Sequence, residues 1–310
     1  KMEKHVFEYV QRDRKFVVEI GELAKQANGA CLVRYNDTAV LSSAVCSNQV
    51  MATDFFPLTV LYQEKLYAGG KIPGGFLKRE SRPTEHETLV SRLIDRPIRP
   101  LFADGYRNEV QVINMVLSAD PNCSPAMAAM LGASLSLGVS DIPFQGPIAG
   151  VVVGRINGEY VLNPSVEELE ASDINLTVAG TIKAINMVEA GAKQVSEDDM
   201  LGALEFAHAE IKKLCAWQME IIEAVGKTKQ VPDLFTIPAE LENAIREYAF
   251  DDLKEAISTY DKLEREANIE AVNEKTRVHF DEIFASESLE PTELAEKQTY
   301  VNMVLEHMLA

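Results

Sequence analysis

Residues 71–102 read KIPGGFLKRESRPTEHETLVSRLIDRPIRPLF, a glycine-rich turn followed by a pattern typical of a helix. Between Lys71 and Arg107 there are eight Lys or Arg against five Asp or Glu, a local net charge of +3 in a chain whose formal net charge is -18. Clustered cations repel one another unless an anion lies on them, so the stretch predicts a ligand that carries phosphate. The alternative is a solvated charged helix with a basic loop.

The tip of the turn places an aromatic ring beside two cations, in the order Phe76, Leu77, Lys78 and Arg79. This combination suits single-stranded nucleic acid, because the ring can stack on a base while the cations meet backbone phosphates. The alternative is that Phe76 and Leu77 pack into the protein core.

A helix is expected to follow this turn, because Thr84 and Glu87 have the spacing of a capping box. Leu89 and Leu93 should mark its buried side, since they lie four residues apart. The helix therefore begins close to the basic turn.

Three arginines, Arg92, Arg96 and Arg99, recur along this helix at positions i, i+4 and i+7. Pro97 should end the regular helix near Arg96, because proline has no N–H and clashes with the preceding turn. Asp95 can form an ion pair that fixes one guanidinium group. The three arginines are candidate contacts for phosphate.

The chain has 310 residues, of which 46% are hydrophobic, enough for one large core or two modest ones. No apolar run approaches the length of a membrane span, and the first residues do not resemble a signal peptide. The four cysteines are widely spaced and the five histidines lack ligand spacing. We therefore expect no disulfide framework or zinc site, and a reducing cytoplasm.

The rest of the first 226 residues alternates between strand and helix patterns. Strands are expected at residues 16–20, 30–35, 38–45, 55–62, 109–118, 148–156, 159–162, 174–178 and 184–189. Helices are expected to start at Ser124-Pro125 and at Ser196, the second ending before Gly226. This order predicts an α+β unit with mixed sheets.

Residues 227–238 contain two prolines without periodicity and predict a linker, and residues 239–310 have helical periodicity and predict an all-α domain. From Glu197 onward there are 26 acidic against 11 basic residues. Such a face should repel nucleic acid and confine a polyanion to the basic stretch, although simple solubility explains it equally well. The last residues stop within an apolar helical pattern, which predicts that the sequence is part of a longer protein.

Several motifs occur in a characteristic order: FFPLTV at 55–60, the glycine loop, RLIDRPIRPLF at 92–102, DIPFQGPIAG at 141–150 and LTVAG at 176–180. Together they closely resemble bacterial polynucleotide phosphorylase, in its first ribonuclease-PH-like core and the helical domain that follows. RLIDRPIRPLF is specific to that family, whereas LTVAG alone is a weak signal. The resemblance covers essentially the whole chain and implies a ribosomal protein S5 domain 2-like core before the all-α domain.

This resemblance implies phosphorolysis, in which inorganic phosphate attacks the 3′-terminal phosphodiester of RNA and releases a nucleoside diphosphate with the help of Mg²⁺. Full-length members have two such cores, then KH and S1 domains, and form ring-shaped homotrimers with a central channel. Single-stranded RNA and phosphate are thus the implied substrates in mRNA turnover. A helicase or nuclease of the RNA degradosome is an implied partner.

The family's Phe-Phe-Arg-Arg loop, which narrows the channel and grips RNA, falls on residues 76–79 by this resemblance. Leu77 and Lys78 replace one Phe and one Arg, so one stacking ring is lost while both charges remain. By the same match the three helix arginines should line the RNA path toward the active site.

The resemblance places the family's working site in the second core, where a Gly-Ser-Ser-Ser segment holds phosphate and two aspartates with a lysine serve metal and acid chemistry. Here residues 122–125 read Asn-Cys-Ser-Pro, and the other three positions hold Leu169, Asn175 and Thr177. Leu and Thr cannot bind Mg²⁺ as a carboxylate does, so we expect no catalytic or metal-binding residue in this chain. The nearby acids Glu168 and Asp173 are interpreted as surface residues.

Two other functions share parts of this pattern. A non-catalytic RNA-binding or assembly subunit of an exosome-like ring shares every feature and differs only in whether a catalytic core follows residue 310. A stand-alone ribonuclease-PH enzyme that trims tRNA ends is disfavoured by the missing Asp and Lys residues. The sequence therefore favours a part of polynucleotide phosphorylase that binds RNA and builds the ring but is inactive alone.

Overall fold

The computed structural model describes residues 3–51, 53, 55–74, 80, 82–287 and 289–309. Contacts within the chain divide it into two compact units, residues 1–234 and 235–310. The predicted linker, residues 227–238, spans the boundary between them. Its first half packs on the first unit, where the N–H of Lys227 donates to Val139 O at 3.0 Å and that of Gln230 to Asp141 O at 2.8 Å.

The first unit contains a six-stranded sheet in the order β1-β2-β3-β4-β6-β5. Its strands are β1 (His5–Gln11), β2 (Arg14–Ile20), β3 (Gly29–Tyr35), β4 (Thr38–Val50), β5 (Leu58–Glu64) and β6 (Asn108–Ser118). All neighbours are antiparallel except β5 and β6, which are parallel. The predicted turn between β3 and β4 is confirmed, with Asn36 at a φ of 48°.

Strand β5 begins three residues later than expected, at Leu58. Pro57 explains the difference, since proline has no N–H to donate to a strand ladder. Its carbonyl accepts a hydrogen bond from the N–H of Val110 at 3.0 Å.

A second sheet of four antiparallel strands has the order β10-β9-β7-β8. These strands are β7 (Ala149–Ile156), β8 (Glu159–Leu162), β9 (Ile174–Gly180) and β10 (Ile185–Ala192). The strands predicted at residues 148–156 and 159–162 form a hairpin joined by Asn157 and Gly158, whose φ values are 50° and 83°. The short helix α3 (Val166–Glu170) follows β8 and was not foreseen from the sequence. It begins with a capping box in which Ser165 is the N-cap.

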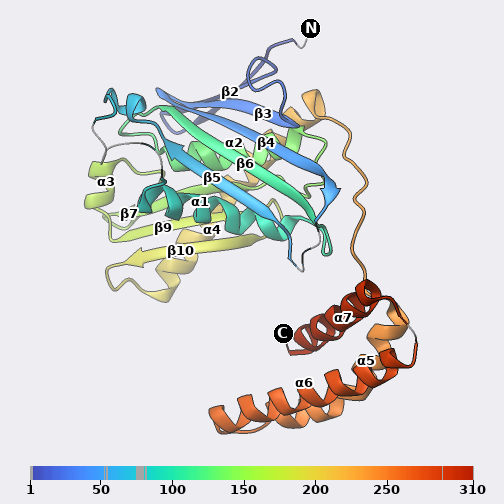
Figure 1. The fold of residues 1–310 in the computed structure, drawn as a ribbon. Coiled ribbons are helices and arrows are strands. Elements are labelled where there is room, and N and C mark those ends of the chain that lie inside the picture. Colours follow the sequence, from blue (N-terminus) through green and yellow to red (C-terminus); the bar gives the residue numbers. More distant parts are fainter. Residues whose placement is uncertain are drawn as a thin grey trace. The chain divides into compact units, whose positions relative to one another are not determined.

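Helices α1 (Glu85–Ile98) and α2 (Pro125–Val139) lie between the two sheets, as Figure 1 shows. Helix α4 (Glu197–Val225) covers the other face of the second sheet, where Phe206 packs against Tyr160 of β8. Gly150 of β7 lies on the opposite face, since a Cβ added there would meet Met130 Sδ of α2 at 2.2 Å. The layers therefore run sheet, helices, sheet, helix.

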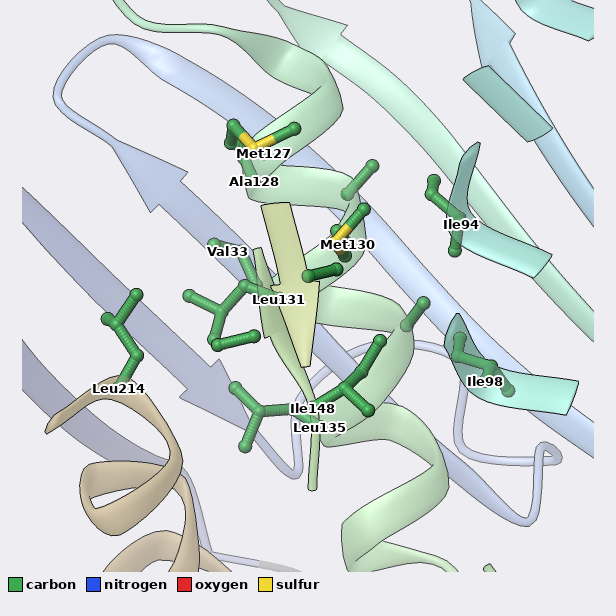
Figure 2. Close-up of a cluster of buried hydrophobic side chains, with 14 of the residues drawn as sticks. Val33, Ile94, Ile98, Met127, Ala128, Met130, Leu131, Leu135, Ile148 and Leu214 are labelled. Atoms are coloured by element: carbon green, nitrogen blue, oxygen red, sulfur yellow. The ribbon is translucent and has the colours of Figure 1, made fainter. Parts of the chain in front are cut away.

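The core extends from the first sheet through α1 and α2 to the second sheet and α4. Figure 2 shows Ile94 and Ile98 of α1, Met130, Leu131 and Leu135 of α2, and Val33 of β3 gathered in one apolar cluster. The small residues of α2 allow close contact with the first sheet, because a Cβ on Gly132 would meet Ser42 Oγ at 2.2 Å. Helix α2 therefore packs closely against the first sheet.

Two predictions about α1 are wrong. The helix continues through Pro97 to Ile98, and then passes into a 3-10 turn, Arg99–Leu101. Proline removes one hydrogen bond, but Pro97 and Ile98 are both buried, and the N–H of Arg99 still donates to Asp95 O.

The buried side of α1 is the Val90, Ile94 and Ile98 stripe, while Leu89 is 56% exposed and Leu93 is half-buried. The buried stripe is therefore rotated by one residue from the predicted one. Leu89 stands instead beside the exposed arginines of the helix.

The second unit consists of α5 (Ala239–Ile257), α6 (Lys262–Ala285) and α7 (Pro291–Leu309), as the helical periodicity predicted. Its core contains Ile245, Ala249, Leu253, Phe280, Phe284, Val301, Val304 and Leu305. Ile257, at the end of α5, and Tyr260, which follows it, are exposed. Within the described part of the chain, no helix has the length and apolar character needed to cross a membrane.

Candidate nucleic-acid interface

Helix α1 is fixed on the free edge of β5, the last strand of the first sheet. The Glu87 carboxylate accepts a hydrogen bond from the N–H of Glu64 at 2.7 Å and also from that of Thr84 at 2.6 Å. Ser91 Oγ accepts from the N–H of Tyr62 at 2.9 Å. Side chains of α1 thus satisfy backbone groups that an open strand edge would leave unpaired, and they fix the orientation of the helix.

Arg99 contributes to the same attachment. Its Nη1 donates to Phe56 O and its Nη2 to Leu58 O, both at 3.0 Å, while Nε and Nη2 bind the Asp95 carboxylate at 2.9 and 2.7 Å. The expected role of Asp95 in fixing one guanidinium is confirmed. Most donors of Arg99 are engaged in these bonds, which leaves few of them for a phosphate. Its predicted contact with RNA stays a prediction.

The other two arginines have different neighbours. Arg92 and Arg96 line a groove of about 450 Å³ together with Leu89, Val90, Leu93 and Glu189. Both guanidinium groups are exposed. Residues four apart on a helix lie on the same face about 6 Å apart, so the groove presents two cations in a row beside apolar side chains.

Glu189 of β10 is the only acidic side chain among the described residues that line this groove, and its place here was not foreseen from the sequence. Its Oε2 lies 3.6 Å from Nη1 of Arg96. Asn186, also in β10, donates from Nδ2 to Pro97 O at 3.0 Å. No local sequence motif identifies Glu189 as a groove residue. Its position follows from the register of β10, which the sequence alone does not give.

The remaining cations of the basic stretch differ in their exposure to solvent. Lys71 and Arg82 are exposed, whereas Arg107 is buried and its carbonyl accepts a hydrogen bond from the N–H of Met51. The predicted RNA-binding residues Phe76, Leu77, Lys78 and Arg79 lie outside the described residues. The groove on α1 is therefore the part of the predicted interface that the structure places.

The residues expected to replace a phosphate-binding segment form a tight turn before α2. The N–H of Cys123 donates to Asp120 O at 3.1 Å, and the Thr38 hydroxyl donates to Cys123 O at 2.8 Å. Cys123 is fully buried, and burial raises the pKa of its thiol to about 12. The thiol is therefore protonated at neutral pH and is a poor nucleophile.

The three positions expected to have lost catalytic groups carry no acid. Asn175 and Thr177 project from β9 on the same face as Gly150, and Leu169 belongs to α3. Within the described residues, no three His, Cys, Asp or Glu side chains are grouped to hold a metal ion. An amide, a hydroxyl and an isobutyl group do not fit Mg²⁺, which prefers carboxylate and water oxygens.

The two neighbouring acids, interpreted from the sequence as surface residues, are partly exposed, and each is bound to an arginine. Asp173 binds Arg155 at 2.8 Å, and this arginine lowers the pKa of the carboxyl. Glu168 is half-buried, closes the cap of α3 and binds Arg12 at 3.1 Å. Both carboxylates are thus held by arginine, which explains why they are unsuited to bind a metal ion.

Comparison with known proteins assigns the first unit. The profile described as "3′ exoribonuclease family, domain 1" matches residues 12–143, and "3′ exoribonuclease family, domain 2" matches residues 146–210. The two matches together cover more than half of the chain. The first contains β2 to β6 with α1 and α2, and the second contains the four-stranded sheet and the first half of α4. The chain belongs to the 3′ exoribonuclease family.

Curated members of this family are closely similar to the chain. It is 59% identical over 280 residues to the polyribonucleotide nucleotidyltransferase of Bacillus cytotoxicus, covering 90% of the chain and 39% of that protein. It is 56% identical over 306 residues to the protein of the same name from Enterococcus faecalis, covering 99% of the chain and 43% of that protein. The chain thus spans about two fifths of the length of these exoribonuclease relatives.

The family membership confirms the fold class predicted from the sequence. The mixed sheets and helices of the first unit are a ribonuclease-PH-like core, and a helical region, α4–α7, follows. The resemblance to polynucleotide phosphorylase is also confirmed, because polyribonucleotide nucleotidyltransferase is the same enzyme under its systematic name.

Proposed function

We propose that the protein to which this chain belongs degrades single-stranded RNA from the 3′ end by phosphorolysis. An oxygen of inorganic phosphate attacks the phosphorus of the terminal phosphodiester, the bond to the 3′ oxygen of the preceding nucleotide breaks, and a nucleoside diphosphate leaves. The identity of 56–60% to polyribonucleotide nucleotidyltransferases supports this proposal. Cytoplasmic mRNA turnover is the corresponding cellular role.

The share of this chain in that reaction is to hold RNA, and the groove on α1 carries this part of the proposal. Arg92 and Arg96 present two exposed cations, while Leu89 and Leu93 provide apolar surface. Phosphates of a single strand would bind the guanidinium groups, and a base would lie on the apolar side chains. Phe76 and Arg79 would extend these contacts along the strand.

Catalysis would come from residues outside this chain. Leu169, Asn175 and Thr177 supply neither a carboxylate for a metal ion nor an acid for the leaving oxygen. Mg²⁺, where the whole enzyme uses it, would polarise the phosphate oxygens at that other site. A homotrimeric ring would bring three copies of the α1 groove around one strand, and a helicase or nuclease would supply unfolded RNA.

A phosphorolysis assay tests the division of labour. The 310-residue chain is incubated with poly(A), Mg²⁺ and inorganic phosphate, and ADP release is measured together with RNA binding. We expect weak, salt-sensitive binding without significant ADP release. Robust ADP release would contradict the assignment of catalysis to another part of the protein, and absence of binding would contradict the role of the α1 groove.

A further inference from the structure

The ion pair between Arg96 and Glu189 joins two elements that are far apart in the sequence. Arg96 belongs to α1 and Glu189 to β10, and their side chains are 52% and 66% exposed. Exposed ion pairs are weak and exchange partners readily, because water and salt screen both charges. An anion that enters the groove can therefore displace the Glu189 carboxylate.

Glu189 is nevertheless directed at the groove by the fold. It pairs with Thr177 of β9, which pairs in turn with Val152 of β7, so its side chain projects from the sheet face that Gly150 marks. That face covers α1 and α2, as the approach of Gly150 to Met130 shows. The hydrogen bond from Asn186 to the end of α1 holds β10 beside the helix. The carboxylate thus stays close to Arg96.

The two groove arginines therefore differ in their ion-pair partners. Arg96 has a carboxylate partner inside the protein, whereas Arg92 forms no ion pair with any residue that the structure describes. An anion reaching Arg92 meets an unopposed cation. An anion reaching Arg96 has to compete with Glu189.

We propose that Glu189 is an internal substitute for an RNA phosphate, which neutralises Arg96 until a strand displaces it. This inference rests on the proposed function of the groove in binding RNA. Glu189 then favours an RNA strand over a small anion. A single small anion can bind Arg92, but it gains little further affinity from Arg96, because Glu189 already neutralises that arginine. A strand that places consecutive phosphates on both arginines displaces the carboxylate, because the second phosphate is already held near its site.

This exchange changes the ions that accompany binding. Each RNA phosphate that meets a guanidinium releases a condensed cation, which makes affinity fall as salt rises. The Glu189 carboxylate set free by RNA becomes an exposed anion and attracts a cation from solution. Replacing Glu189 with a neutral residue removes this uptake, so the dependence of log K on log salt should become steeper by up to about 0.7, the value for one contact on a single strand.

The experiment measures poly(A) binding by the 310-residue chain at about 50 to 200 mM salt, where such slopes are well resolved. Glu189→Gln should bind about two- to fivefold more tightly and with a steeper slope. Glu159→Gln is the matched control, because Glu159 is an exposed glutamate of β8, at the opposite edge of the same sheet. It should bind like the unmodified chain.

A variant without Arg96 separates displacement from general repulsion. In the Arg96→Ala background, Glu189→Gln should change neither affinity nor slope, because the carboxylate acts through Arg96. Equal tightening in both backgrounds, or equal tightening by Glu159→Gln, would overturn the inference. If Arg92→Ala and Arg96→Ala weaken binding while Glu189→Gln has no effect, only the role of Glu189 fails. If neither arginine variant weakens binding, the proposed function of the groove fails.

Discussion

Nη2 of Arg99 donates a hydrogen bond to the carbonyl oxygen of Leu58 at 3.0 Å, across the free edge of β5. A second bond from Nη1 to Phe56 O and the ion pair with Asp95 complete the attachment. An arginine predicted to bind RNA thus also holds the helix that carries the two other candidate arginines.

Replacing Arg99 with Ala should therefore reduce stability more than RNA affinity. Two backbone carbonyls lose a charged donor, and such bonds contribute about 1.5–3 kcal/mol each when buried, less when half-exposed as here. We expect the free energy of unfolding in urea to fall by about 1–2 kcal/mol. Arg82→Ala, at an exposed arginine of the same stretch, is the control and should leave stability unchanged.

Gly132 in α2 offers a test of the packing between helix and sheet. A Cβ at this position would meet Ser42 Oγ at 2.2 Å and Val33 Cγ2 at 3.3 Å, and Ser42 is itself bonded to Asn114. Although alanine favours helix by about 1 kcal/mol, overpacking a rigid core costs about 1–3 kcal/mol, and the broken Ser42 bond adds to it. Gly132→Ala should thus lower the thermal midpoint.

A glycine without close neighbours provides the comparison. Among the described residues, no atom outside the chain neighbours of Gly69 lies within 4 Å of a Cβ added there, so Gly69→Ala should leave the thermal midpoint close to that of the unmodified chain. A Gly132→Ala variant as stable as Gly69→Ala would show that α2 is not packed as closely as the structure indicates.

Arg155 should govern stability at acidic pH. It binds Asp173 and Asp199. The contact with Arg155 lowers the pKa of Asp173 from an ordinary value of 3.8, and the hydrogen bond from the Ser196 hydroxyl together with Arg155 lowers that of Asp199. A depressed pKa means that the unfolded chain binds protons first as pH falls, so this stabilisation is full above about pH 4 and is lost through the lower folded pKa values.

The Arg155→Met variant should consequently be less stable at pH 7 and lose less of its stability between pH 4 and the acid range. Urea unfolding at a series of pH values measures this difference. Parallel stability curves for Arg155→Met and the unmodified chain would exclude the linkage.

Local patterns predicted much of this fold. The Thr84–Glu87 capping box acts through nearby backbone, so it was readable from sequence, and so were the strands on either side of the Asn157-Gly158 turn. The errors concern tertiary packing. Leu89 is exposed because α1 turns Val90 and Ile94 to the core, and burial of Pro97 and Ile98 keeps the helix intact past a residue that disfavours it.

The candidate site was likewise predicted only in part from the sequence. Arg92 and Arg96 were found by helical spacing, because residues four apart share a face. Glu189 was missed, since its place depends on strand order and on a register shift in β10 between Ile185 and Met187. Arg99 was correctly paired with Asp95, but its bonds to β5 required the helix and strand to be seen together.

The salt dependence of poly(A) binding by Arg92→Ala/Arg96→Ala, compared with the unmodified chain, tests the central claim most directly. Loss of two phosphate contacts should weaken binding and flatten the slope of log K against log salt by about 0.7 to 1.4. Each contact on a single strand is worth about 0.7, and the cation that the freed Glu189 takes up in the unmodified chain subtracts from the sum. Arg246→Ala, in the helical unit, should leave the slope unchanged. An unchanged slope in the double variant would contradict the assignment of the α1 groove to RNA.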